Sequence, residues 1–180
     1  MIKNIYTPDF NWQIMVESAN AEYKFQPQLT SKLDTHIGEF SELTVLEIVL
    51  WKVNRYPELN PDILKEINSL RLLYDEEQAR IVLKELLVLR GFDLAMASTV
   101  LRFACPHQCQ IIDQRVLRFI RQDVGRIKIP FNKDKKVVFY FEYLKELTEI
   151  CTQFSIPFIM ADRIFYQIDK HANKNIPIKY

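Results

Sequence analysis

The chain has 180 residues, of which 48% are hydrophobic and 26% charged, proportions that are ordinary for a globular domain. Its formal net charge of +1 at pH 7 excludes a strongly basic protein, so nucleic-acid binding would require a local basic patch. The three cysteines argue against a disulfide-stabilised protein and favour reduced thiols. No apolar run approaches the roughly 18 residues of a membrane span, so the chain is expected to be a cytoplasmic protein rather than a membrane protein.

Scarce glycine and periodic apolar residues predict about eight helices in an all-α fold. Residues 1–40 give weak signals, for a helix over about 8–21 and a short helix from Thr30. The segment 41–55 is apolar on more than one face, which predicts a helix at the centre of the core. Ser41, Asn60 and Asp75 stand where side chains cap helices. The remaining helices are expected from 61, over 76–89, over about 94–105, from 114, over 136–154 and over about 158–171.

The rest of the chain is organised around the segment 83–121, in which a tight turn over 90–93 joins two helices. Gly91, one of only three glycines, can adopt the positive φ that a sharp turn between helices often demands. Asp93 stands where a side chain caps the second helix. A connection from Pro106 follows, and Asp113 then begins a third helix.

Three motifs in this segment resemble the helix-hairpin-helix DNA glycosylase superfamily. They are Leu89-Arg90-Gly91-Phe92-Asp93, then Ala97-Ser98, then Ile111-Ile112-Asp113. Trp51-Lys52 and Asp162-Arg163 are similar to positions in a bacterial branch of that superfamily. The resemblance runs from about residue 40 onward and implies one two-lobed helical domain over 1–180. The hairpin would lie in a lobe over about 41–123, and 1–40 and 124–180 would form the second lobe.

The resemblance implies that Gly91, Phe92 and the amides after them bind a backbone phosphate of double-stranded DNA. Free N–H groups and the positive end of a helix favour an anion at such a turn. The family's second glycine is replaced here by Asp93. Its carboxylate would satisfy the same amides and repel a phosphate. The alternative is a capped helix turn without a ligand.

Asp113 corresponds, by the resemblance, to the catalytic aspartate of these glycosylases. Cleavage of an N-glycosidic bond builds positive charge on the sugar, which a carboxylate can stabilise, and a carboxylate can also activate a water molecule. The alternative role is an N-cap for the next helix, and both roles can hold together. Residues 94–97, where bifunctional members carry a nucleophilic lysine, contain none, so the resemblance implies a monofunctional enzyme.

A basic stretch follows Asp113. Arg115, Arg118 and Arg121 recur every three residues and are expected on one face of a helix. Residues 113–136 hold eight basic and three acidic residues, enough to contact several phosphates. The alternative is an ordinary solvated surface.

Two aromatic residues, Trp51 and Tyr166, are candidates for stacking on a flipped base between the lobes, or are ordinary core aromatics. Cys105 and Cys109 lack the second ligand pair of a zinc site, and neither a metal nor another cofactor is expected. The sequence thus predicts a monomeric, DNA-binding protein that resembles a monofunctional DNA glycosylase. The alternative is a non-catalytic helical scaffold of the same fold that has lost phosphate binding.

Overall fold

The computed structural model describes residues 11–23, 26–53, 59–89, 91–123 and 127–178, which form helices and the connections between them, with no strand among them. The all-α prediction is confirmed. The elements in chain order are α1 (Trp12–Glu22), α2 (Pro27–Asp34), α3 (Glu42–Val53), α4 (Pro61–Leu72), α5 (Glu76–Leu86), α6 (Leu94–Ala104), α7 (Gln114–Arg121), α8 (Lys133–Gln153), the 3₁₀ turn η1 (Phe158–Met160) and α9 (Ala161–Ala172).

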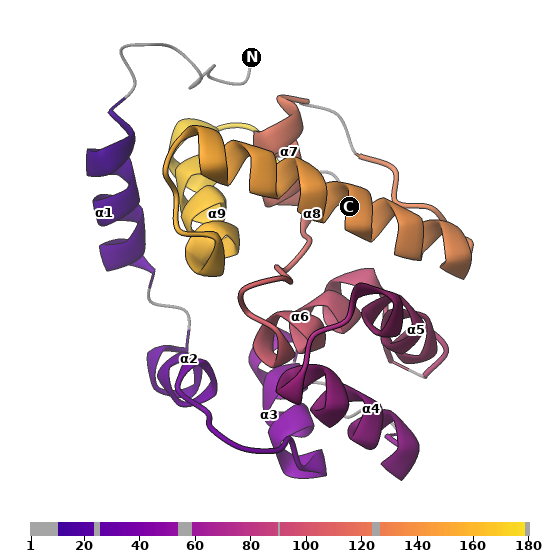
Figure 1. The fold of residues 1–180 in the computed structure, drawn as a ribbon. Helices are drawn as coiled ribbons and strands as arrows, with labels where there is room; N and C mark the ends of the chain where they lie inside the picture. The colour runs from indigo at the N-terminus through magenta and orange to yellow at the C-terminus, as the bar shows by residue number, and fades with distance from the viewer. Residues whose placement is uncertain (1–10, 24–25, 54–58, 90, 124–126, 179–180) are drawn as a thin grey trace.

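The helices lie in two groups (Figure 1). In one group α6 packs on α3, α4 and α5, α4 packs on α5, and α2 packs on α3; in the other, α7 and α1 pack on α9. The long helix α8 contacts α7 and also lies against α5 and α6, so it joins the groups, and one hydrophobic core runs through both. The sequence prediction grouped the residues of α7 with the hairpin helices and those of α2 with the C-terminal helices. In the structure α7 packs mainly on α9 and α8, and α2 packs mainly on α3 while Asp34 at its end also contacts α6 and α9.

Side-chain caps mark where many of these helices begin. The Asp75 carboxylate accepts the Gln78 N–H at 2.8 Å, and Asn60 accepts the Ile63 N–H at 2.8 Å. Ser41 also accepts a main-chain N–H, so all three predicted caps are confirmed. Other boundaries differ from the prediction. Helix α8 begins at Lys133 because Asn132 caps it, α2 begins at Pro27 rather than at Thr30, and α5 ends at Leu86 rather than near 89.

The most enclosed helix is α6, not α3. Ten of its eleven residues are buried, all except Ala95. Helix α3 also belongs to the core through Val45, Ile48 and Trp51, as predicted, but Leu43 on the same helix is 64% exposed. The apolar surface of α3 is therefore only partly covered by other helices. Helix α6, in contrast, contacts α3, α4, α5 and α8. The carboxyl end of α6 leads directly into the connection that carries Asp113.

Candidate functional site

The hairpin turn has the backbone geometry that its sequence predicts. Gly91 has φ +91°, in the left-handed region that favours glycine, and the Phe92 N–H donates to the Leu89 carbonyl at 3.2 Å. A Cβ added at Gly91 would meet nothing within 4 Å, so the requirement for glycine is conformational rather than steric. Arg90, which the motif includes, lies outside the described residues.

Asp93 caps the helix after the hairpin. Its Oδ1 accepts the Met96 N–H at 3.0 Å at the start of α6, and Gly91 and Asp93 are exposed. The predicted cap is confirmed. One of the amides that would face a phosphate is thus already bonded to a carboxylate of the same chain.

Asp113 directly follows a buried stretch, residues 109–112, that is fixed from two sides. The Ile112 N–H donates to Ser98 Oγ at 3.2 Å, which ties the connection to α6. The hydroxyl groups of Tyr140 and Tyr143, both fully buried in α8, donate to the carbonyls of residues 110 and 111 at 2.9 and 2.6 Å. Because Ser98 bonds the residue directly before Asp113, two of the motifs singled out in the sequence meet in space.

The Asp113 carboxylate is held at the positive end of α7. Its Oδ1 accepts the Arg115 N–H at 2.7 Å and the Val116 N–H at 2.9 Å, and the residue is half-buried. The described part of the chain donates no hydrogen bond to its second oxygen, Oδ2. The N-cap role is therefore confirmed, and the position of one carboxylate oxygen leaves the other one available for a different partner.

The three arginines after Asp113 do not form one free face. Arg118 is 2% exposed and donates to the buried Asp169 on α9 through Nε at 2.8 Å and Nη2 at 2.5 Å. Arg115 donates to the same carboxylate at 3.2 Å. Arg121 makes two bonds to Glu146 on α8, at 2.8 and 2.9 Å. Each step of three residues rotates around the helix, so the row turns from α9 toward α8.

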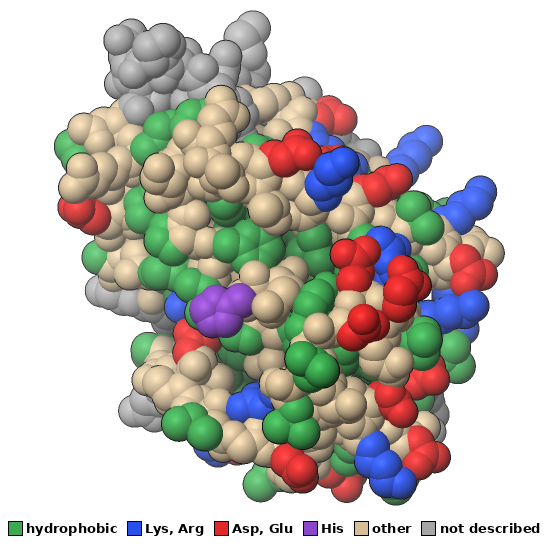
Figure 2. Space-filling model, in the orientation of Figure 1, with side chains coloured by type: hydrophobic (Ala, Val, Ile, Leu, Met, Phe, Trp, Pro, Cys, Tyr) green, Lys and Arg blue, Asp and Glu red, His purple; other side chains and the backbone are tan. Residues whose placement is uncertain are grey.

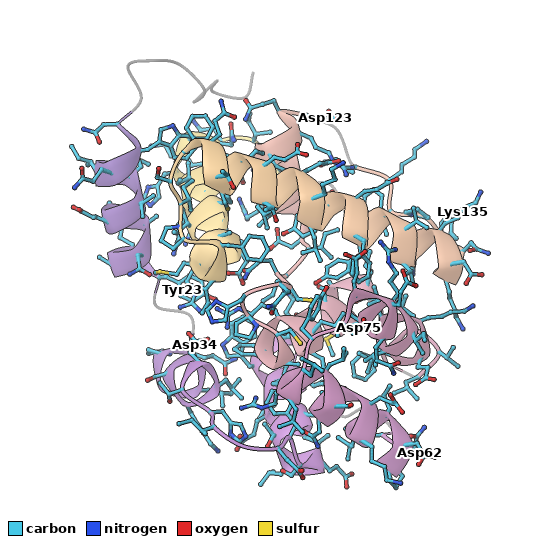
Figure 3. The ribbon with its side chains drawn as sticks, in the orientation of Figure 1. Tyr23, Asp34, Asp62, Asp75, Asp123 and Lys135 are labelled. Atoms are coloured by element: carbon cyan, nitrogen blue, oxygen red, sulfur yellow. The ribbon has the colours of Figure 1, made fainter. Side chains whose placement is uncertain are left out.

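Lysines remain as the exposed cations of the basic stretch. Lys128, Lys133 and Lys135 are exposed near the amino end of α8, where Lys135 points outward (Figure 3). Asp134 among them pairs with Lys84 of α5 at 2.6 Å. On the face seen in Figure 2, basic and acidic side chains are interspersed rather than gathered into one field. Arg126 lies outside the described residues.

The two aromatic candidates have different surroundings. Trp51 is 5% exposed, its Nε1 donates to Thr30 Oγ1 at 2.7 Å, and its ring meets Phe103 edge-to-face at 5.5 Å. This is the environment of a core aromatic with a satisfied indole N–H. Tyr166 on α9 is half-buried beneath the Arg115 guanidinium, 5.4 Å from its ring centre. The two side chains therefore serve separate contacts.

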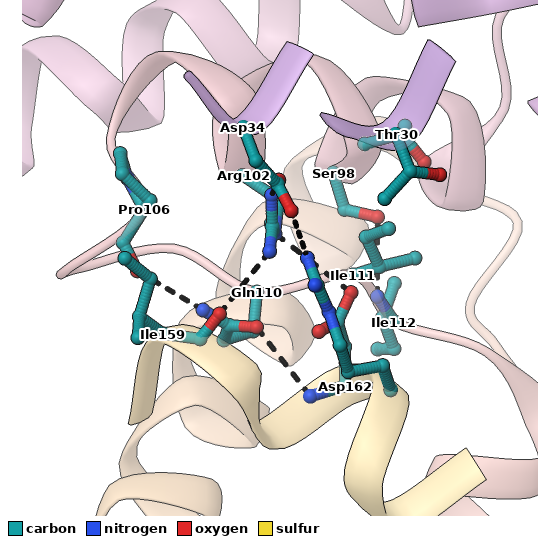
Figure 4. Close-up of polar contacts among 12 residues, drawn as sticks. Thr30, Asp34, Ser98, Arg102, Pro106, Gln110, Ile111, Ile112, Ile159 and Asp162 are labelled. Atoms are coloured by element: carbon teal, nitrogen blue, oxygen red, sulfur yellow. Dashed lines mark hydrogen bonds and ion pairs between the residues drawn. The ribbon is translucent and has the colours of Figure 1, made fainter. Parts of the chain in front are cut away.

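Sequence reasoning missed a polar cluster where α2, α6 and α9 meet (Figure 4). The Asp34 carboxylate bridges two guanidinium groups, those of Arg102 on α6 and Arg163 on α9. A cavity of about 150 Å³ lies beside it. The available signals were Arg102, the single charged residue of α6, and the Asp162-Arg163 pair that the resemblance had singled out. The cavity is lined by Leu33, Asp34, Arg102, Phe103, Pro106, Ile159, Met160 and Arg163.

The three thiols are buried and protonated. Burial raises the pKa of Cys105 to about 11 and that of Cys151 to about 12, and it also raises the pKa of Cys109. A thiol reacts with electrophiles as the thiolate. At neutral pH these side chains are therefore packing residues rather than nucleophiles.

We expect none of the three thiols to react with an aromatic disulfide reagent at pH 7.5 while the protein is folded. All three should react once a denaturant exposes them and restores an ordinary pKa near 8.5. The measurement is the absorbance of the released thiolate with and without denaturant. Rapid release of one equivalent from the folded protein would contradict this environment.

Comparisons with protein-family models, with curated proteins and with solved structures found no match to this chain. Among the helices that the structure describes, none is both long and apolar enough to cross a membrane. Across the same residues, no three His, Cys, Asp or Glu side chains come together as ligands for a metal ion. The glycosylase resemblance therefore stays a prediction that rests on the sequence motifs.

Proposed function

We propose that this protein binds double-stranded DNA and hydrolyses an N-glycosidic bond, with Asp113 as the carboxylate at the reacting sugar. The observation that carries the proposal is the geometry of Asp113. One oxygen is fixed by two amides at the start of α7, while Oδ2 accepts no hydrogen bond from the described residues. A carboxylate fixed in this way needs little reorganisation when positive charge develops beside it.

The reaction breaks the bond between the sugar carbon and the base nitrogen. The base leaves with the bonding electron pair and takes up a proton, and positive charge develops on the sugar. Asp113 stabilises that charge or accepts the proton of the attacking water, whose oxygen then bonds the sugar carbon. The products are a free base and an abasic sugar. The base has to leave the duplex stack before Asp113 can approach its sugar.

The hairpin and the amino end of α8 hold the candidates for phosphate contacts. They are Gly91 and the half-buried Phe92 of the hairpin, and the exposed lysines of α8, among them Lys133 and Lys135. Arg118 contributes to the core instead, because its guanidinium is buried against Asp169. Binding through exposed lysines makes affinity depend strongly on salt.

Asp113→Asn tests the proposal, because asparagine keeps an oxygen for the two amides and removes the negative charge. We expect base release from a lesion-containing duplex to fall at least about 100-fold, as when one transition-state electrostatic contact is lost. The substrates are duplexes with deaminated, oxidised or alkylated bases, and the assay counts free base and alkali-labile sites under single turnover.

Asp75→Asn is the matched control, since Asp75 caps α5 through the Gln78 N–H in the same way. It should leave the rate of base release unchanged. If wild type releases no base from any of the duplexes, or if Asp113→Asn is as active as wild type, the enzymatic proposal is wrong.

A second candidate function is that of a non-catalytic helical scaffold. Two observations favour it: Asp93 occupies an amide that a phosphate would need, and Arg115, Arg118 and Arg121 all pair with carboxylates of the same chain. In that case the helices would present a protein-binding surface, and DNA would bind weakly and without preference for a lesion.

Asp93→Gly separates the two candidates. It removes the carboxylate from the hairpin at a cost of only a few tenths of a kcal/mol in capping, because glycine is tolerated at an N-cap. If the hairpin binds phosphate, duplex affinity at low salt should rise about tenfold and its salt dependence should steepen. Fluorescence anisotropy over a salt series measures both. Asp75→Gly, the same change at α5, should alter neither. Unchanged weak binding by Asp93→Gly favours the scaffold.

A further inference from the structure

One carboxylate joins two helices at the junction of the two groups. Asp34 is the last residue of α2, and its Oδ1 accepts from Arg102 Nη1 at 2.5 Å while Oδ2 accepts from Arg163 Nη2 at 2.7 Å. Each oxygen of the carboxylate thus serves a guanidinium from a different helix, α6 or α9 (Figure 4). Guanidinium groups arranged like this recognise carboxylates and phosphates well.

The Arg102 guanidinium has contacts other than Asp34 that hold it in place. The Arg102 side chain is 3% exposed, and its Nη2 donates to the Ile159 carbonyl at 3.1 Å. Its Nε lies 3.9 Å from the buried Asp162 carboxylate. Burial lowers the pKa of Arg102, but the negative charges of Asp162 and Asp34 raise it by more than that. The pKa is therefore raised overall, and the group stays charged. The Arg163 side chain is 14% exposed.

The arrangement leaves several polar atoms of the cluster unsatisfied. Arg102 Nε, Arg163 Nε and Asp162 Oδ1 are buried and have no hydrogen-bond partner among the described residues. A buried polar atom without a hydrogen-bond partner lowers the stability of the folded protein. The Asp34 carboxylate, whose side chain is 26% exposed, is the member of the cluster with most access to water. It is therefore the one that can leave with the smallest structural change.

Two cavities border the bridge. The first, of about 150 Å³, has apolar walls formed by Leu33, Phe103 and Met160, and this volume holds a benzene-sized ring. A second hollow of about 270 Å³ lies toward α1 and the start of α2. Asp34 and Arg163 line both, so a ligand in either one lies beside their ion pair.

We propose that Arg102 and Arg163 form a binding site for a small aromatic carboxylate, and that Asp34 is an internal carboxylate which this ligand replaces. The ring occupies the 150 Å³ cavity, and the ligand's carboxylate takes the two guanidinium contacts. Asp34 then turns into the water to which it is already partly exposed. The site is separate from the proposed DNA function and does not depend on it.

The charges favour an anion over other ligands. With Asp34 turned outward, the remaining charged groups are Arg102, Arg163 and Asp162, which sum to one positive charge. A cation would meet two guanidinium groups, and a neutral ring would gain the apolar walls but not the charge-assisted hydrogen bonds. The carboxylate is therefore the group that distinguishes the ligand.

Benzoate is the probe, and benzamide is the control of the same shape without charge. Isothermal titration calorimetry at constant ionic strength should give saturable binding of benzoate and at least tenfold weaker binding of benzamide. Asp34→Asn, which removes the competing charge, should tighten benzoate binding about tenfold. Arg163→Gln should abolish it. Asp62→Asn, at an exposed acidic residue paired with Lys65, should have no effect.

If a variant fails to fold, wild-type protein still tests the proposal, because the wild type is itself expected to bind benzoate saturably. Absence of saturable binding to wild type and to folded Asp34→Asn overturns the proposal. So does equal binding of benzoate and benzamide, which would mark a purely apolar cavity. A benzoate affinity that Arg163→Gln leaves unchanged would place the ligand elsewhere.

Discussion

Replacing Asp169 by alanine is expected to destabilise the protein by about 3–5 kcal/mol, because it leaves a buried cation without its anion. Asp169 has no exposed surface and accepts from Arg118, Arg115 and the Asn173 side chain. Arg118 is itself 2% exposed, and apart from Asp169 its hydrogen bond goes to the carbonyl of residue 176 at 3.0 Å. The variant would have to keep this guanidinium buried and unpaired or open the contact between α7 and α9.

Chemical denaturation of the variant and the wild type gives the difference in unfolding free energy. The control is Glu146→Ala, which removes the partner of Arg121 at a place where the Glu146 side chain is 42% exposed. We expect a loss of at most about 1 kcal/mol there, since solvent screens exposed pairs. Similar losses in both variants would mean that burial of the Arg118 pair adds nothing.

Phe165→Ala is expected to cost about 3–5 kcal/mol, the range for removing a large aromatic side chain from a core. Phe165 is fully buried in α9, with its ring 5.1 Å from that of Phe119 in α7 and 6.4 Å from that of Trp12 in α1. Removing the ring leaves a cavity between α1, α7 and α9, so the packing of both α1 and α7 on α9 becomes weaker.

Phe131→Ala is the matched control because the same side chain is completely exposed there. Thermal and urea unfolding should place this variant within about 0.5 kcal/mol of wild type. A cost below about 1.5 kcal/mol for Phe165→Ala would indicate that α1 and α7 close over the gap, and would contradict tight packing at this junction.

Local signals predicted the start of most helices. Asn60, Asp75, Asp93 and Asp113 each precede a helix and bond an amide two or three residues further on, so the whole interaction lies within a short window of sequence. The positive φ of Gly91 was predictable for the same reason. The two-lobed, glycosylase-like arrangement stays a prediction, because it depends on how helices far apart in the chain are placed.

Long-range pairing could not be predicted in the same way. Arg118 was expected on a basic surface, but its partner Asp169 lies 51 residues later. Asp34 and Arg163 are 129 residues apart, and nothing near either residue indicates the other. Charge spacing along one helix shows which residues share a side of that helix. It does not show what packs on that side, and packing decides whether an arginine is a surface cation or a core residue.

The place of Asp169 in the last helix also affects when the chain can fold during synthesis. A ribosome-bound chain that ends within α8 already contains Arg118 and Phe119 but not the carboxylate or the aromatic ring of α9 that cover them. We expect α7 to remain unpacked until α9 has emerged from the ribosome. Helices α4, α5 and α6 contact one another and can therefore pack earlier. The Arg118 guanidinium therefore lacks its carboxylate partner while about fifty further residues are translated.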